Sequence, residues 1–155
     1  MRLLSRTLVA LALTNAIASA SIEQATLPNG RLQCTVHSAG NQTDDVPNIL
    51  KAFTTCGNGG DIVFPESEDY YIATRLNPTV NDVRIHWHGQ WTFSPNLTYW
   101  RQNSYPIFFQ NHAAGFVLSG DGIWINGYST GGIFGNGNTW VRLLQVLVNA
   151  VKCGQ

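Results

Sequence analysis

Two histidines and one acidic turn have the residue types and spacing that metal chemistry requires. His86 and His88 lie two residues apart on a presumed strand, so both side chains share one face and could bind the same ion. A catalytic zinc site uses about three protein ligands, however, and no third histidine or cysteine is placed beside this pair. Glu66, Glu68 and Asp69 suggest calcium, but calcium takes about six to eight oxygens and such a turn is more often a solvated loop. We therefore predict neither a metal ion nor another cofactor.

The pair Asp44 and Asp45 precedes a segment with the signals of a helix N-terminus. A carboxylate at this point can accept from the free N–H groups of the first turn, and Pro47 loses no hydrogen bond there. We expect the helix to end at Cys56 and Gly57. Apolar residues recur at spacings of three and four, which predicts one buried stripe formed by Val46, Ile49, Leu50 and Phe53.

The first twenty residues have the three-part pattern of a cleavable secretory signal peptide. Arg2 and Arg6 precede an apolar stretch over 8–13, and small residues follow over 18–20. A membrane anchor is the alternative, but Thr14 and Asn15 interrupt the apolar stretch well before the about 20 residues that a bilayer requires. Cleavage after residue 20 would leave 135 of the 155 residues, which suits one secreted domain with no membrane anchor.

Composition excludes some function classes. Nine basic and nine acidic residues balance, and loss of Arg2 and Arg6 would leave a formal charge of −2, so nucleic-acid binding has no electrostatic support. Charged residues make up 12% of the chain, half the usual about 25%, while glycine occurs 15 times. This composition argues against a helical bundle.

Cysteines and glycosylation triplets agree with an oxidising compartment. A secreted chain with few cysteines first suggests a disulfide, and Cys34 with Cys56 is the favoured pair. Cys153 is then free, intermolecular, or an addition foreign to the ancestral fold. Asn41 and Asn96 begin acceptor triplets for N-linked glycans, whereas proline excludes the triplet at Asn77.

Short strand-like runs closed by Gly, Asn, Pro or Asp fill most of the remaining chain, with almost no helical spacing up to residue 140. After a polar leader, the expected strands are 32–36, 61–64, 70–74, 83–87, 90–93, 106–110, 115–118 and 123–126. Ile62, Ile85 and Phe108 recur every 23 residues, a period typical of a solenoid coil. The pattern favours an all-β parallel β-helix and, less well, a β-sandwich. Most of the five tryptophans are expected in its core.

Several segments together resemble a known family. Residues 43–45, a helix ending near Cys56, Gly59-Gly60 and the run 62–65 resemble the N-terminal cap of pectin-lyase-type β-helices. The segments 86–100 and 131–140 resemble secreted exopolygalacturonases of glycoside hydrolase family 28. The resemblance implies a right-handed parallel β-helix with a short N-terminal capping helix, truncated because residues 21–140 correspond only to the N-terminal part of such an enzyme.

The resemblance also implies an activity, which is hydrolysis of terminal α-1,4-linked galacturonic acid from polygalacturonate and oligogalacturonides, with inversion and without a cofactor. The family's motifs for this chemistry are Asn-Thr-Asp, an Asp-Asp pair, Gly-His-Gly and Arg-Ile-Lys, and none can be placed here. Asn138-Thr139 continues with Trp140, Arg84-Ile85 continues with His86, and Trp87 precedes His88-Gly89. Asp44-Asp45 belongs to the cap region, so we assign no catalytic residues.

The tail over 141–155 departs from the family, because its apolar residues recur at helical spacing where further β-coils would be expected. We interpret it as a substitute sequence, arising from a frameshift, retained intron or mispredicted exon, which would also explain Cys153. The leading hypothesis is a secreted exopolygalacturonase-like chain that is truncated and inactive. The alternatives are a secreted pectin-binding β-helix module without catalysis, and a pectate-lyase-type enzyme.

Overall fold

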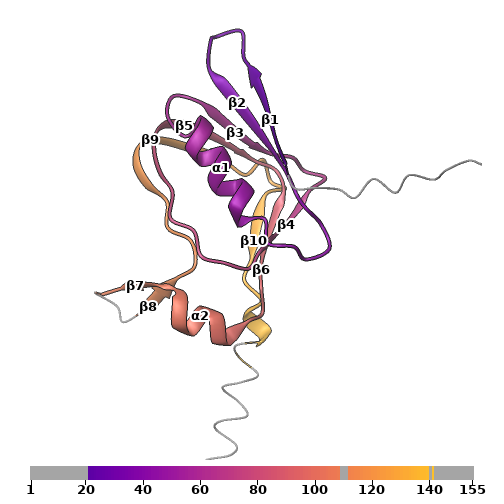
Figure 1. Ribbon diagram of the computed structural model, residues 1–155, viewed down its shortest axis with the longest axis vertical. Coiled ribbons are helices and arrows are strands. Elements are labelled where there is room, and N and C mark those ends of the chain that lie inside the picture. The colour runs from indigo at the N-terminus through magenta and orange to yellow at the C-terminus, as the bar shows by residue number, and fades with distance from the viewer. Residues whose placement is uncertain (1–20, 109–111, 140, 142–155) are drawn as a thin grey trace, which may run out of the picture.

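The computed structural model describes residues 21–108, 112–139 and 141, and these residues form mostly strands (Figure 1). The predicted signal peptide and the predicted tail, apart from Val141, lie outside the described residues. In chain order the elements are β1 (Ser21–Thr26), β2 (Leu32–His37), α1 (Val46–Cys56), β3 (Asp61–Phe64), β4 (Asp69–Ile72), β5 (Thr79–Trp87), β6 (Gln90–Phe93), α2 (Leu97–Asn103), β7 (Tyr105–Ile107), β8 (His112–Ala114), β9 (Ser119–Asn126) and β10 (Gly132–Phe134).

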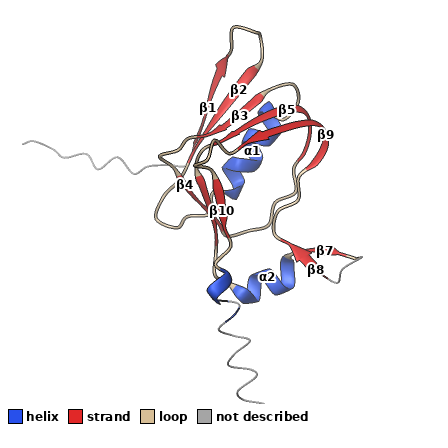
Figure 2. Ribbon diagram, turned by 180° about the vertical axis from the view of Figure 1, so that it is seen from behind, coloured by secondary structure: helices blue, strands red, loops and turns tan. Residues whose placement is uncertain are grey.

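The chain adds strands in turn to two parallel sheets. One sheet has the order β1-β2-β3-β5-β9, in which only β1 pairs antiparallel, and the other has the order β10-β6-β4. Thus β3, β5 and β9 each precede a strand of the smaller sheet, β4, β6 and β10. Figure 2 shows the larger sheet at β1, β2, β3, β5 and β9 and the smaller sheet at β4 and β10. A β-sandwich of the immunoglobulin type has antiparallel sheets. The observed pairing therefore disagrees with the sandwich alternative.

The predicted repeat is correct for one step and wrong for the next. Ile62 stands directly beside Ile85 in the register of β3 and β5, but the next position is occupied by Ile125 of β9. Phe108, which the 23-residue spacing placed there, is 91% exposed. The reason is that α2 and the β7–β8 hairpin lengthen the connection between β6 and β9.

Helix α1 lies against the five-stranded sheet, where it contacts β1, β2, β3 and β5 (Figure 1). The predicted stripe is buried at Val46, Ile49 and Phe53, whereas Leu50 is half-buried. The last residue of α1, Cys56, forms a disulfide with Cys34 of β2, which is the predicted pair.

Removal of this disulfide is expected to weaken the fold, because the bond closes a chain segment with a separation of 22 residues. Replacing both Cys34 and Cys56 with alanine should lower the free energy of unfolding by about 3 kcal/mol. Urea unfolding of the double variant beside the oxidised chain measures the difference. A change below about 0.5 kcal/mol would show that α1 is held by packing alone.

Helix α2 is absent from the sequence prediction, which expected almost no helix between residues 57 and 140. Asn96 caps it, since its Oδ1 accepts a hydrogen bond of 3.0 Å from the N–H of Tyr99. Trp100 fixes it to the body of the protein by donating from Nε1 to the carbonyl of Ser94 at 2.8 Å. The seven-residue helix is too short to show a clear helical period.

Other boundaries also differ from the prediction. The polar leader contains β1, and β10 forms beyond the last expected strand, 123–126. The predicted strand 115–118 contributes only an isolated bridge between Phe116 and Leu76. A corner does occur at Gly131, where a Cβ atom would overlap the carbonyl oxygen of Trp87.

Aromatic rings fill the space between the two sheets. Phe64 lies 5.3 Å from Tyr70 and 5.2 Å from Trp91, measured between ring centroids, and Trp87 lies 4.3 Å from Trp91. Trp87, Trp91 and Trp100 are buried as predicted, but Trp124 is 45% exposed. The chain thus has one described tryptophan outside its core. Within the described residues, no helix is both long enough and apolar enough to cross a membrane.

Candidate functional site

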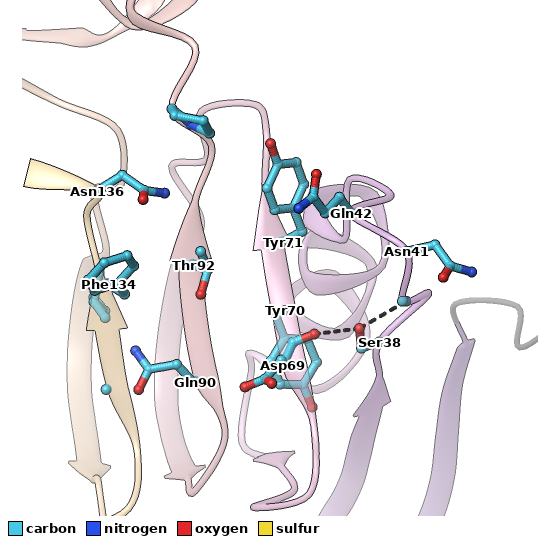
Figure 3. Close-up of a pocket in the computed structure, with 14 residues that line it drawn as sticks. Ser38, Asn41, Gln42, Asp69, Tyr70, Tyr71, Gln90, Thr92, Phe134 and Asn136 are labelled. Atoms are coloured by element: carbon cyan, nitrogen blue, oxygen red, sulfur yellow. Dashed lines mark hydrogen bonds between the residues drawn. The ribbon is translucent and has the colours of Figure 1, made fainter. Parts of the chain in front are cut away.

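A groove of about 920 Å³ lies on the outer face of the three-stranded sheet (Figure 3). Its floor consists of two rows of side chains that the strand register places side by side. One row is Asp69, Gln90 and Gly132, and the other is Tyr71, Thr92 and Phe134. Alternate residues of the same strands point inward, so Tyr70 and Trp91 are fully buried below the floor.

One wall of the groove is the loop over residues 38–42, and Asp45 holds this wall in place. The Asp45 carboxylate accepts hydrogen bonds from the N–H of Ala39 at 2.7 Å and from the N–H of Tyr71 at 2.8 Å. It therefore joins the wall to the floor strand β4. Burial raises the pKa of Asp45, although the hydrogen bonds from Ala39, Tyr71 and Ser38 oppose that rise.

The predicted helix-capping role is wrong for Asp45 and correct only in part for Asp44. Asp45 occupies the cap position, but its side chain makes no cap hydrogen bond because it is turned toward the loop and β4. Asp44 Oδ1 accepts from the N–H of Val46 at 3.3 Å, and more closely from the N–H of Ala73 at 2.9 Å. Its Oδ2 accepts from the hydroxyl of Thr74 at 2.6 Å. The acidic pair therefore positions β4 and the segment that follows it.

Glu68 strengthens the same wall rather than lying in a solvated loop as predicted. Its carboxylate accepts from the N–H of Ser38 at 3.0 Å and lies 3.0 Å from Nδ1 of His37. The Ser38 hydroxyl donates to the carbonyl of Asp69 at 2.6 Å and accepts from the N–H of Gly40 (Figure 3). Glu68 is held in this way because the acidic turn lies against the end of β2, where the N–H of Ser38 is available to donate.

The lining of the groove suits a ligand rich in hydroxyl groups. Amide and hydroxyl side chains such as Gln90, Thr92 and Asn136 offer neutral donors and acceptors, while Tyr71 and Phe134 offer ring faces. The described lining residues include one carboxylate, Asp69, and no lysine or arginine. Such a surface can bind and orient a carbohydrate by hydrogen bonds and ring contacts.

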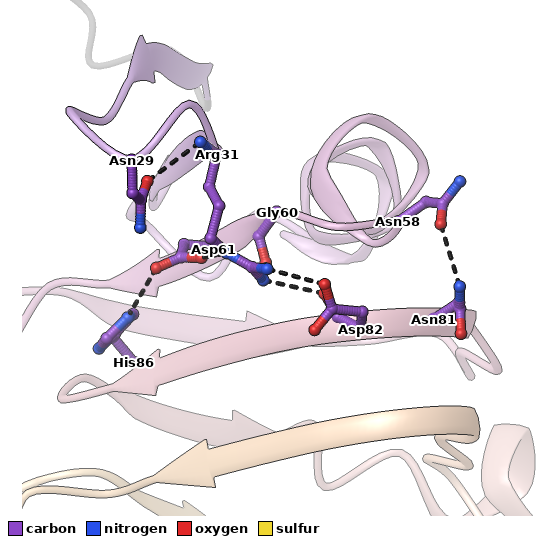
Figure 4. Close-up of polar contacts among 8 residues, drawn as sticks. All are labelled: Asn29, Arg31, Asn58, Gly60, Asp61, Asn81, Asp82 and His86. Atoms are coloured by element: carbon purple, nitrogen blue, oxygen red, sulfur yellow. Dashed lines mark hydrogen bonds and ion pairs between the residues drawn. The ribbon is translucent and has the colours of Figure 1, made fainter.

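His86 and His88 lie on the outer side of the other sheet, away from the groove. His86 Nε2 is 3.3 Å from Asp61 Oδ2 (Figure 4). Its Nδ1 is 2.6 Å from the hydroxyl of Tyr128. The ring of His88 stacks on the ring of Tyr128 at 3.9 Å. In the part of the chain that the structure describes, no three His, Cys, Asp or Glu side chains gather as a metal site would require.

Asp61 is a buried carboxylate whose two oxygens have different partners, Arg31 and His86. Arg31 donates from Nε to its Oδ1 at 2.6 Å, and a second guanidinium nitrogen contacts Asp82 at 2.8 Å (Figure 4). Burial alone would raise the pKa of Asp61, but the hydrogen bonds from Arg31 and His86 outweigh it and leave that pKa below its ordinary value of 3.8.

Loss of the Asp61 carboxylate should therefore have a pH-dependent effect. A carboxylate whose pKa is lower in the folded chain than in the unfolded chain stabilises the fold at pH values above its unfolded-state pKa. This stabilisation is lost as the pH falls through the folded-state pKa. Replacing Asp61 with asparagine should lower the free energy of unfolding by about 2 kcal/mol at pH 7 and by less at pH 3. Urea unfolding at both pH values gives the comparison. An equal loss at both would mean that the carboxylate acts through its shape and not its charge.

The two glycosylation candidates occupy different places. Asn41 is exposed on the loop that forms the groove wall, and its φ of 51° places it in the left-handed region. Asn96 is also exposed, and its Oδ1 caps α2 by accepting from the N–H of Tyr99.

The floor residues Tyr71, Gln90, Thr92 and Phe134 were not singled out from the sequence. Their period-two alternation with buried Tyr70, Ile72 and Trp91 was a usable signal for the outer face of a sheet. That signal does not show which outer face has walls, because the walls come from residues 38–42 and from Pro95 and Asn136.

Comparison with known proteins shows the family to which this chain belongs. A protein of Aspergillus niger with the assigned name galacturan 1,4-alpha-galacturonidase C is 67% identical over 112 residues, which are 72% of this chain and 26% of that protein. The chain is a relative of the family 28 galacturonidases. An exopolygalacturonase of Cochliobolus carbonum is 37% identical over 111 residues, covering 71% of this chain and 24% of its own.

The likeness to family 28 extends to a solved structure. The crystal structure of endo-xylogalacturonan hydrolase from Aspergillus tubingensis matches with a TM-score of 0.57 and 36% identity, over 68% of this chain and 27% of that one. No family model matches the chain. The chain spans about a quarter of the length of its family 28 relatives and corresponds to their N-terminal portion.

Proposed function

We propose that this chain is the N-terminal part of a secreted, exo-acting polygalacturonase fold and that its groove binds a stretch of pectin. The observation that carries this proposal is the 67% identity to a galacturonidase over 112 residues of this chain. The groove's hydroxyl, amide and aromatic lining supports a polysaccharide ligand. Polygalacturonate and oligogalacturonides are the proposed partners.

The proposed architecture is a right-handed parallel β-helix in which α1 caps the N-terminal end. Support comes from the parallel register of β2, β3, β5 and β9 and from the matching register of β4, β6 and β10. A solenoid of this kind buries each coil against the next and needs a cap at its end. The contacts of α1 with β1, β2 and β3 are those expected of such a cap.

We propose further that these 155 residues do not hydrolyse polygalacturonate by themselves. An inverting glycosidase needs a carboxylic acid and a carboxylate about 6.5–9.5 Å apart, on opposite sides of the scissile bond. The groove offers Asp69 alone among its described lining residues, and the sequence lacks the family's Asn-Thr-Asp, Asp-Asp and Gly-His-Gly motifs. The chain is therefore proposed to bind pectin without cleaving it.

Incubation of the purified chain with polygalacturonate tests this proposal. We expect no galacturonic acid in the supernatant by chromatography, together with retention of the protein on immobilised polygalacturonate. A Tyr71→Ala variant should lose part of that retention, while the exposed Lys51→Gln variant on α1 should keep it. Release of galacturonic acid would overturn the proposed inactivity, and equal retention of both variants would overturn the proposed groove.

Secretion and N-glycosylation belong to the same proposal and rest on residues 1–20 and on the triplets at Asn41 and Asn96. In a fungal secretory host, we expect a Thr98→Ala variant to lose one glycan while Asn96 still caps α2. Mass spectrometry before and after glycan removal measures this loss. An unchanged mass difference between the variant and its parent would exclude a glycan at Asn96.

A further inference from the structure

The outer face of the five-stranded sheet carries a row of aromatic and basic side chains where β5 lies beside β9. Arg84 pairs in register with Trp124, and His86 pairs with Asn126. Beyond the strand ends, the ring of His88 stacks on Tyr128. We call this set of six residues the β5–β9 strip. It lies on a different sheet from the groove.

Trp124 is the apolar element of the strip. Its side chain is 45% exposed, whereas the other tryptophans in the described part of the chain are at most 7% exposed. The ring of His86 lies 5.4 Å from the ring of Trp124, measured between centroids, at an interplanar angle of 62°. Trp124 therefore leaves aromatic surface open to solvent, and an aromatic ring can stack on the apolar side of a sugar ring.

The rings beside Trp124 are fixed by a chain of hydrogen bonds. Buried Asp61 contacts His86 Nε2, and His86 Nδ1 contacts the hydroxyl of Tyr128 at 2.6 Å. Asn126 Oδ1 accepts from the N–H of Tyr128 at 2.9 Å and helps to hold its φ at 51°, in the left-handed region. A non-glycine residue in this region costs about 1 kcal/mol or more, so other contacts must hold Tyr128 there. The surface is thus ordered before any ligand binds, which lowers the entropic cost of binding.

Arg84 supplies a positive charge that no neighbour neutralises. It is exposed, and the described residues offer it no hydrogen bond or ion pair. Asp61, its register partner on β3, and Asp82, two residues before it on β5, are already bound by Arg31 at 2.6 and 2.8 Å. The Arg84 guanidinium is therefore available for a carboxylate from outside, which it can bind through two parallel hydrogen bonds.

We propose that the β5–β9 strip is a second sugar-binding site, separate from the groove, and that it takes a uronic acid residue of a polysaccharide. The sugar ring stacks on Trp124, and its carboxylate pairs with Arg84. Asn126 and His86 lie two register positions along the strip, at the next pair on the same face, where a second sugar's hydroxyl groups would come within reach. The strip accounts for the anionic part of the ligand, which the groove, lacking a described cation, does not.

The test uses signals that report the strip and the groove separately. The purified chain is titrated with trigalacturonate, a linear trimer of α-1,4-linked galacturonic acid, while the NMR signal of the Trp124 indole N–H is followed. We expect a saturable shift of this signal. Arg84→Gln should weaken that binding about tenfold, the size of a lost charge-assisted hydrogen bond. The matched Lys51→Gln variant removes an exposed cation on α1 and should leave the affinity unchanged.

A neutral galactose trimer should bind the strip more weakly than trigalacturonate does. Equal binding of the two trimers, or an Arg84→Gln variant with unchanged affinity, would overturn the role of charge. A Trp124 signal that does not move, while amide signals of Tyr71 and Thr92 do, would overturn the strip and leave the groove. If the Trp124 signal moves while the amide signals of Tyr71 and Thr92 do not, the proposed groove site is overturned and the strip is supported.

Discussion

Replacing Trp91 with alanine is expected to lower the free energy of unfolding by about 4 kcal/mol. Trp91 is fully buried, and its ring contacts Phe64, Trp87 and Phe116 at centroid distances of 5.2, 4.3 and 5.3 Å. It stands at the centre of the space between the two sheets, so the cavity left behind cannot be filled by one neighbour. Urea unfolding followed by tryptophan fluorescence measures the change.

Trp124→Ala is the matched control for this prediction, because it removes the same side chain from an exposed position. We expect a loss of less than about 1 kcal/mol for it, as for most surface substitutions. Equal losses for Trp91→Ala and Trp124→Ala would contradict the placement of one ring between the sheets and the other on the outer face.

Replacing Asp45 with alanine is expected to destabilise the fold by about 3 kcal/mol and to open the groove. The substitution leaves the N–H groups of Ala39 and Tyr71 without their acceptor, and the Ala39 residue is buried. The loop over 38–42 should then separate from β4 and expose its amides to hydrogen exchange. Asp69→Asn, in the same groove but exposed, should change stability by less than about 0.5 kcal/mol. Unchanged exchange at Ala39 in Asp45→Ala would contradict the anchoring role.

The sign of the pH dependence distinguishes Asp45 from Asp61. Because burial raises the folded-state pKa of Asp45, its ionisation opposes folding, and stability falls as pH rises from the ordinary value of 3.8 through the raised pKa. Asp45→Asn cannot ionise, so the unaltered chain should lose stability relative to this variant over that interval. A relative gain would instead show that the hydrogen bonds from Ala39 and Tyr71 outweigh burial.

Local pattern was sufficient to predict the elements whose residues alternate or recur. The expected strand 83–87 lies within β5, and the spacing of Ile62 and Ile85 predicted their register. The same reasoning placed α1 from the apolar stripe. In each case one face of a regular element is buried, so its apolar residues recur in the sequence at the period of that helix or strand.

Non-local contacts explain what the sequence could not predict. Asp45 has the residue type and position of a helix cap, yet its partners lie 6 residues before it and 26 residues after it. The groove likewise exists only where residues 38–42 meet β4, β6 and β10. Most tryptophans were expected in the core, but the sequence did not show which one lies outside; the register position of Trp124 beside exposed Arg84 places it there. Each error arises where tertiary contacts override a local preference.

Titration of the isotope-labelled chain with trigalacturonate, followed by backbone amide chemical shifts, tests the proposed pectin-binding groove most directly. We predict saturable shifts on the outer face of the three-stranded sheet, at Tyr71, Gln90, Thr92 and Phe134, with little change at α1. An absence of saturable shifts at these four residues, while the chain remains folded, would contradict the assignment of the groove as a pectin-binding surface.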